Sequence, residues 1–208
     1  MEQYNNCSET MEAGDHFKNE ASSKSQKNRY WLDNNKLKLK LALVFIPVAY
    51  FSFFFHELGH WILGEIFGND MIISLNSVSP VSGQYVENTD VYAISGGPFF
   101  TILLALIFWC IIEKYKVIYA YPIVFFSFFI RVFPQIKFDL QDEAKISELL
   151  GIGKYTILII VLASLLLITW RASRVLKLNY KDNLLCIIVS LLCTILVIIT
   201  DELFFSIK

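Results

Sequence analysis

Five long apolar stretches follow residue 40, and they constrain the fold of this chain more than any other feature. An α-helix needs about 20 apolar residues to cross the hydrocarbon core of a bilayer, and most of the stretches approach or exceed that length. They predict an all-α polytopic membrane bundle of about five transmembrane helices, of which the third is the shortest. The stretches are 41–67, 91–112, 117–130, 155–170 and 183–200.

Composition and charge support this fold class and divide the chain in two. The chain is 55% hydrophobic and 18% charged, against roughly 45–50% and 25% in soluble domains. Residues 1–36 are polar and predicted to be a disordered cytoplasmic tail. Residues 37–208 are predicted to form the transmembrane domain, with its functional core at about 41–150. A net charge of −1 without a broad basic stretch excludes nucleic acid as a partner and leaves the lipid bilayer and membrane-associated molecules.

The distribution of basic residues predicts the orientation. Twelve Lys and Arg residues flank the predicted helices on the side of the N-terminus, and five lie on the other side. The excess places the N-terminus in the cytoplasm. Lys outnumbers Arg by 14 to 4, which favours an AT-rich bacterial genome, so we expect an integral protein of a bacterial plasma membrane.

A polar segment, residues 74–90, interrupts the apolar part of the chain. Pro80 and Gly83 supply turn chemistry between β-prone residues, which predicts a short hairpin or a re-entrant loop after the first helix. An extended substrate could add a strand to such a hairpin.

The sequence His56-Glu57-Leu58-Gly59-His60 lies inside the first apolar stretch and has the H-E-x-x-H pattern. On a helix, residues four apart share a face, so both imidazoles can bind one Zn²⁺ while Glu57 reaches the water beside it. An unpartnered ionisable side chain in hydrocarbon costs on the order of 2–3 kcal/mol or more, which favours a functional cluster. The pattern predicts one zinc per chain, bound by His56 and His60, with Glu57 as the catalytic general base of a hydrolase.

A catalytic zinc usually has three protein ligands, and the remaining histidine, His16, lies in the polar tail. The third ligand is therefore expected to be a carboxylate from residues 138–146. Asp139 and Asp142 both qualify, and either could instead cap a short helix that ends near Gly151. Arg131 is expected to be a snorkelling anchor, with an ion pair to one of these carboxylates as the alternative.

These motifs resemble the site-2 protease family of intramembrane zinc metalloproteases. The resemblance rests on the H-E-x-x-H in the first apolar stretch, on Gly97-Pro98 in the second, and on an Asp downstream of Pro134. It implies Asp142 as the third ligand, with Asp139 as the alternative, and it implies substrate binding by Gly97, Pro98 and Thr101. Thr101 replaces an Asn common in the family, and Glu143 replaces a Gly.

The function expected from residues and resemblance together is intramembrane proteolysis. The substrate would be a membrane protein or peptide, hydrolysed by zinc-activated water with Glu57 as the general base. The alternative is a non-catalytic membrane binding or scaffolding protein derived from such a protease. A second enzymatic alternative is an H-E-x-x-H membrane metalloprotease of another type, which uses a Glu as its third zinc ligand.

Overall fold

The computed structural model describes residues 35–133 and 141–205, with side chains from 38 to 203. The chain divides into two units, Met1–Lys40 and Leu41–Lys208. In the first unit the described residues, 35–40, are helical, and the rest of the predicted tail lies outside the described residues.

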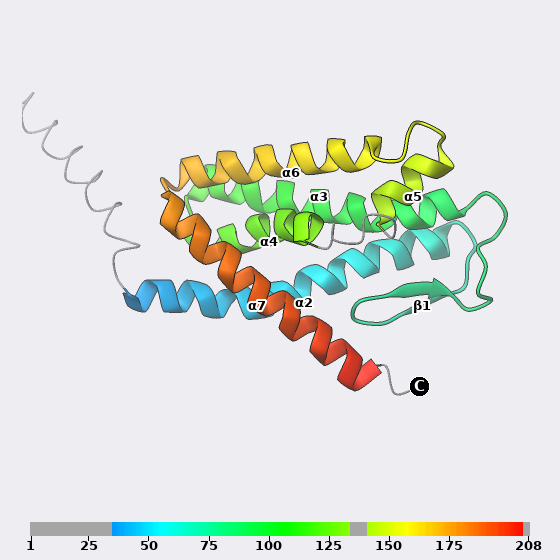
Figure 1. Cartoon of the computed structure of the whole chain (residues 1–208), viewed down its shortest axis with the longest axis horizontal. Coiled ribbons are helices and arrows are strands. Elements are labelled where there is room, and N and C mark those ends of the chain that lie inside the picture. Colours follow the sequence, from blue (N-terminus) through cyan, green and yellow to red (C-terminus); the bar gives the residue numbers. More distant parts are fainter. Residues whose placement is uncertain (1–34, 134–140, 206–208) are drawn as a thin grey trace, which may run out of the picture. The chain divides into compact units, whose positions relative to one another are not determined.

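The described part of the chain is mostly helical, which confirms the predicted class. Four helices are long and apolar enough to cross a membrane, namely α2, α3, α6 and α7. The elements in chain order are α2 (Asn35–Ile66), β1 (Met71–Ile73), β2 (Val78–Pro80), α3 (Asp90–Tyr115), the 3-10 helix η1 (Ile118–Ala120), α4 (Tyr121–Val132), α5 (Asp142–Leu149), α6 (Thr156–Val175) and α7 (Tyr180–Phe205). Figure 1 shows α3 and α6 side by side, and the two helices are in contact.

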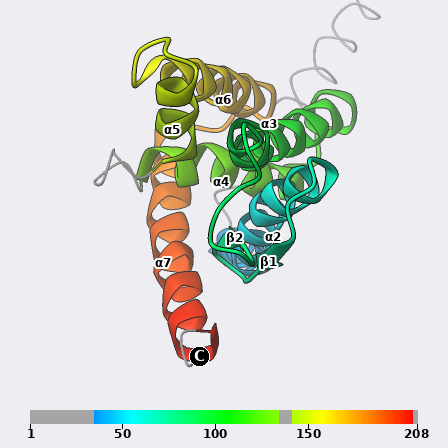
Figure 2. The same cartoon turned by 90° about the vertical axis from the view of Figure 1, so that its right-hand side faces the viewer.

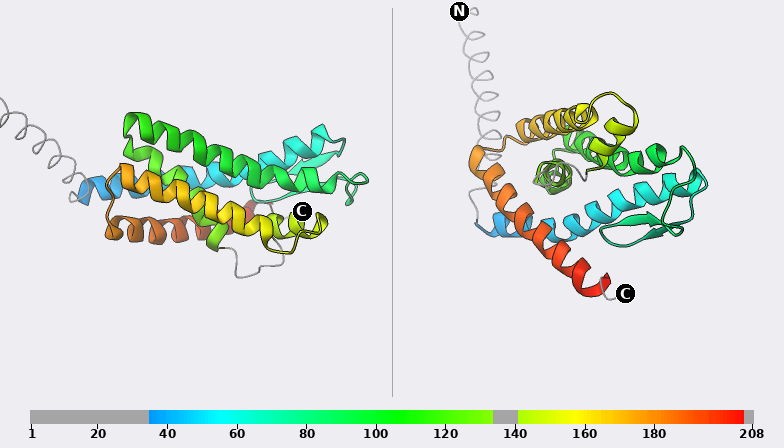
Figure 3. Two further views of the ribbon diagram at one scale, coloured as in Figure 1. Left: turned by 90° about the horizontal axis from the view of Figure 1, so that it is seen from above. Right: turned by 45° about the vertical axis from the view of Figure 1, so that its right-hand side comes forward.

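The third predicted span differs from the expectation. It forms η1 and α4, and the 12 residues of α4 extend about 18 Å, well short of the roughly 30 Å hydrocarbon core. Nine of the 12 residues are buried, and the right-hand view of Figure 3 shows α4 nearly end-on among the longer helices. Thus α4 is apolar because other helices cover it.

Two glycines bring α2 and α3 into close contact. A Cβ built on Gly59 would overlap the backbone of Gly96, and a Cβ on Gly96 would overlap that of Gly59. Glycine at both positions therefore lets the two backbones approach more closely than any side chain would allow. The approach places the first turns of α3 against the face of α2 that carries the histidines.

The hairpin after α2 begins earlier than predicted. Its strands pair antiparallel with Met71 opposite Pro80, so β1 precedes the predicted segment. The chain leaves α2 through Gly68, whose φ of +87° suits glycine. The buried Asn69 side chain then accepts the N–H of Val86 at 2.7 Å and donates to Thr89 Oγ1 at 3.0 Å. Figure 2 shows the hairpin beside α2, held by these bonds.

Candidate metal centre

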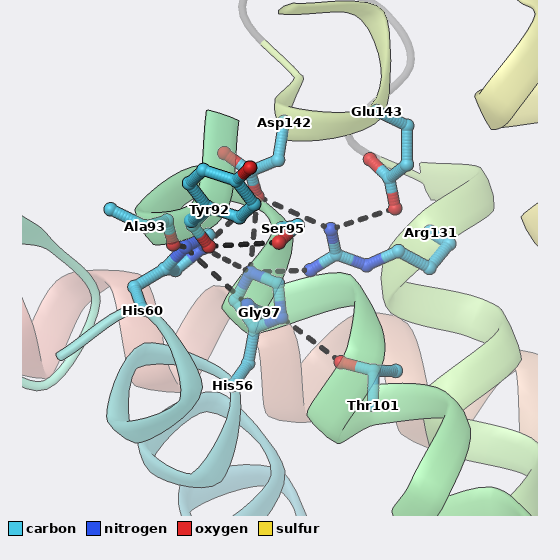
Figure 4. Close-up of polar contacts among 10 residues, drawn as sticks. All are labelled: His56, His60, Tyr92, Ala93, Ser95, Gly97, Thr101, Arg131, Asp142 and Glu143. Atoms are coloured by element: carbon cyan, nitrogen blue, oxygen red, sulfur yellow. Dashed lines mark hydrogen bonds and ion pairs between the residues drawn. The ribbon is translucent and has the colours of Figure 1, made fainter. Parts of the chain in front are cut away.

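The two histidines of the motif point toward α3 and α5. His56 and His60 are one helical turn apart on α2, and their side chains are buried in the protein interior. Figure 4 shows both rings directed at Asp142, which is the first residue of α5. The structure thus brings together two predicted ligands from one helix and a third that is more than 80 residues away in the sequence.

The three groups have the spacing of metal ligands. Asp142 Oδ2 lies 3.2 Å from His56 Nε2 and 3.3 Å from His60 Nε2, and the two Nε2 atoms are 3.1 Å apart. Ligand atoms about 2.0–2.1 Å from a tetrahedral zinc lie about 3.3–3.4 Å from one another. The buried His56, His60 and Asp142 group could therefore bind a metal ion.

The remaining ring nitrogens indicate which atoms are free to bind a cation. His60 Nδ1 donates to the carbonyl oxygen of Ala93 at 3.0 Å, so in the neutral ring Nε2 carries the lone pair. His56 Nδ1 contacts the hydroxyl of the buried Thr101 at 2.9 Å. Hydrogen bonds of this kind orient metal-bound histidines and select their tautomer. Their Nε2 atoms then face the Asp142 carboxylate as acceptors, an arrangement that a cation would stabilise.

The Thr101 hydroxyl gives a specific prediction about the site. Replacing Thr101 with Val keeps the shape of the side chain but removes the partner of His56 Nδ1. We expect metal affinity to fall by about 10- to 100-fold, measured by competition with a chelator of known affinity. Thr101→Ser, which keeps the hydroxyl, is the control and should stay within a few-fold of wild type. Equal affinities for the two variants would contradict this role; the predicted substrate-binding role of Thr101 stays a prediction.

Gly97 and Pro98 are also buried at this position on α3. A Cβ built on Gly97 would overlap the rings of both His56 and His60. The absence of a side chain at Gly97 therefore leaves the space that the two imidazole rings occupy. The predicted contacts of Gly97 and Pro98 with substrate stay predictions.

Gly97→Ala should therefore disrupt the metal centre. The added methyl group can be accommodated only if the rings or α3 move, so we expect most of the bound metal to be lost while the helix content stays unchanged. Metal content and circular dichroism measure the two quantities. Gly64→Ala is the control on α2, because the atoms nearest to its methyl group belong to the side chain of Met71 and not to the histidines. Full metal content in Gly97→Ala would contradict the prediction.

Glu57 lies between the two histidines in the sequence and is also buried, with 8% of its surface exposed. Its carboxylate interacts electrostatically with His60, Asp142 and Arg131, which places it in the same charged cluster. A buried carboxylate beside a possible metal site is the group that general-base catalysis requires. Its predicted catalytic role stays a prediction.

The capping role considered for Asp142 is not observed, because Gln141 is the N-cap residue of α5 and no side-chain cap hydrogen bond is formed. The Asp142 carboxylate lies in the first turn of α5, where the helix dipole favours negative charge, and it faces the two histidines. Burial alone would raise the pKa of Asp142, but the hydrogen bonds with His56 and His60 hold that pKa well below its usual range. The alternative ligand, Asp139, lies outside the described residues.

The prediction that Arg131 is a snorkelling anchor is wrong. The Arg131 side chain is 11% exposed and turns into the cluster, where Nη1 lies 3.7 Å from Asp142 Oδ2 and 3.3 Å from Glu143 Oε1. The contact with Asp142 agrees with the alternative prediction of an ion pair, whereas the sequence did not indicate the contact with Glu143. Nothing in the local sequence distinguishes this fully buried carboxylate from that of Glu148, which is exposed on the same helix.

Among the described residues, the cluster holds more carboxyl groups than cationic groups. With neutral histidines and ionised carboxyl groups, these residues would carry three negative charges (Glu57, Asp142 and Glu143) and one positive charge (Arg131), which sum to −2. Uncompensated charge in a low-dielectric interior is costly. A divalent cation at the His56–His60–Asp142 site would neutralise the cluster.

A tyrosine that sequence reasoning missed belongs to the same surroundings. Burial raises the pKa of Tyr85, and the negative charges of Asp142, Asp90 and Glu57 raise it further. Tyr85 therefore keeps its proton at neutral pH and can act as a hydrogen-bond donor. Because it follows β2, its position brings the loop after the hairpin near the candidate metal centre.

No family model, curated protein or solved structure matches this chain.

Proposed function

We propose that this protein is an intramembrane zinc metalloprotease that hydrolyses peptide bonds of membrane-associated substrates. The observation that carries the proposal is the convergence of His56 Nε2, His60 Nε2 and Asp142 Oδ2 at 3.1–3.3 Å, next to the buried Glu57. Two imidazoles and a carboxylate are a ligand set that suits zinc. The long apolar helices and the resemblance to the site-2 protease motifs favour a membrane-embedded substrate.

Each residue of the motif has a defined task in this mechanism. Zinc held by His56, His60 and Asp142 would act as a Lewis acid that makes water nucleophilic near neutral pH. Glu57 removes the proton from the attacking water and transfers it to the nitrogen of the leaving amine. The buried surroundings exclude competing water, which strengthens the electrostatic interactions within the site.

The position of the histidines along α2 gives the expected depth of cleavage. His56 and His60 precede the end of α2 at Ile66 by ten and six residues, or about 15 and 9 Å along the helix. A substrate helix would thus be cut about 9–15 Å inside its end on the hairpin side. It must unwind there, because helical hydrogen bonds and side chains shield its peptide bonds, and the freed backbone groups then need new partners.

The hairpin can supply those partners by strand addition. Deleting residues 77–84 removes β2 and its turn but leaves Asn69, Val86 and Thr89, whose hydrogen bonds hold the loop. We expect this variant to keep its zinc and lose cleavage, measured by elemental mass spectrometry and by a peptide-cleavage assay. Cleavage at the wild-type rate would contradict a role of the hairpin in substrate binding.

The proposal is tested with full-length protein in liposomes that also contain synthetic transmembrane peptides. Wild-type protein with zinc should cut a subset of such peptides on the hairpin side, as read by mass spectrometry of the products. Glu57→Gln, with equal zinc content, should not cut them. Equal cleavage by both proteins would overturn the mechanism, and a wild-type protein that binds no zinc would overturn the proposal itself.

A further inference from the structure

The guanidinium group of Arg131 contacts the candidate metal ligands directly. Its Nη2 is 3.1 Å from His56 Nε2, which is the same ring nitrogen that faces His60 and Asp142. Its Nη1 is 3.7 Å from Asp142 Oδ2. The guanidinium group therefore belongs to the same cluster of polar contacts as the three candidate ligand atoms, as Figure 4 shows.

Glu143 holds this guanidinium in place. Its Oε1 lies 3.3 Å from Arg131 Nη1, and the Glu143 side chain is fully buried. The pair connects the last turn of α4 with the first turn of α5, next to Asp142. A buried ion pair contributes little net stability compared with apolar residues of the same size. Its position beside the candidate ligands points to a role in the site rather than in the fold.

We propose that Arg131 is a catalytic residue that donates hydrogen bonds to the substrate carbonyl oxygen, and that Glu143 is its positioning residue. This inference rests on the proposed function. The guanidinium is already held in place by Glu143, so it needs no rearrangement as negative charge develops on the substrate oxygen. This role also explains why the positively charged Arg131 lies beside a candidate metal site, where its charge would otherwise only oppose metal binding.

The step in which Arg131 acts is the addition of water to the peptide bond. The water oxygen forms a bond to the carbonyl carbon, and the carbonyl π electrons move onto the carbonyl oxygen, which becomes negative. Glu57 holds the proton that the water loses. When the C–N bond breaks, the electron pair on oxygen re-forms the carbonyl and the nitrogen takes the proton from Glu57, which yields an acid and an amine. Arg131 stabilises the charge between these two events.

The test uses the double variant Arg131→Gln/Glu143→Gln in full-length protein, because removing both charges leaves no buried carboxylate without its partner. The protein is loaded with Co²⁺, and acetohydroxamate, an oxyanion that binds metal, is titrated while the visible spectrum is recorded. We expect about one metal ion per chain, bound at least as tightly as in wild type, and at least ten-fold weaker acetohydroxamate binding. Arg131→Lys, which keeps the charge but loses the planar fork, should fall between the two.

The matched control is Arg171→Gln/Glu113→Gln, which removes an exposed Arg–Glu pair of 2.8 Å away from the metal centre. It should bind metal and acetohydroxamate as wild type does. Loss of metal from the Arg131/Glu143 variant would show a structural role and overturn the inference. Unchanged acetohydroxamate affinity, or no spectral response in Co²⁺-loaded wild type, would also overturn it. A wild-type protein that binds neither Co²⁺ nor Zn²⁺ would instead overturn the proposed function.

Discussion

Asp142→Ala is expected to lower the zinc content from about one ion per chain to nearly none. A structural or catalytic zinc site needs three or four protein ligands, and Asp142 supplies the carboxylate oxygen that lies within 3.3 Å of both histidines. His60→Ala should have the same effect, because it removes one of only two imidazoles. Elemental mass spectrometry on chelator-free, detergent-purified protein gives the stoichiometry directly.

Asp139→Ala is the matched control for Asp142→Ala. Both changes remove one carboxylate from the same segment, so any general effect of lost negative charge is shared. Full zinc content in Asp139→Ala together with loss in Asp142→Ala would identify the third ligand. The reverse result would transfer that role to Asp139. A well-folded wild type without any metal would favour the scaffolding alternative and leave the motif as a packed polar cluster.

Glu57→Gln is expected to leave the zinc content unchanged and to lower turnover by about 10²- to 10⁴-fold. The amide has almost the same size as the carboxylate but cannot take a proton from water. The measurement is the initial rate of peptide cleavage at matched zinc content. Its physical basis is the burial of Glu57 in the same cluster as the candidate ligands.

Glu65→Gln is the control for this variant. Glu65 is an exposed carboxylate two turns further along α2, and it accepts the backbone N–H of Met71 at 2.8 Å. Its replacement should leave turnover within a few-fold of wild type. The contrary outcome is a wild type that shows no turnover and a Glu57→Gln variant that keeps its zinc and binds a partner protein as tightly as wild type. A binding role would then account for the motif better than catalysis.

Local sequence patterns were sufficient to predict the features that depend on residues close together in the chain. Four of the five predicted spans form helices long enough to cross a membrane in the described part of the chain, because each helix satisfies its own backbone hydrogen bonds. The spacing of His56 and His60 placed both rings on one face of a helix, because residues four apart face the same way.

Contacts between distant segments decided the rest. His56 and Asp142 are 86 residues apart, and Arg131 is 75 residues from His56, so no helical periodicity relates them. The sequence by itself left Arg131 between a snorkelling anchor and an ion pair, because its position beside an apolar stretch fits both. Only the packing of α4 and α5 around α2 and α3 placed its guanidinium in the protein interior, where burial makes a charged partner necessary.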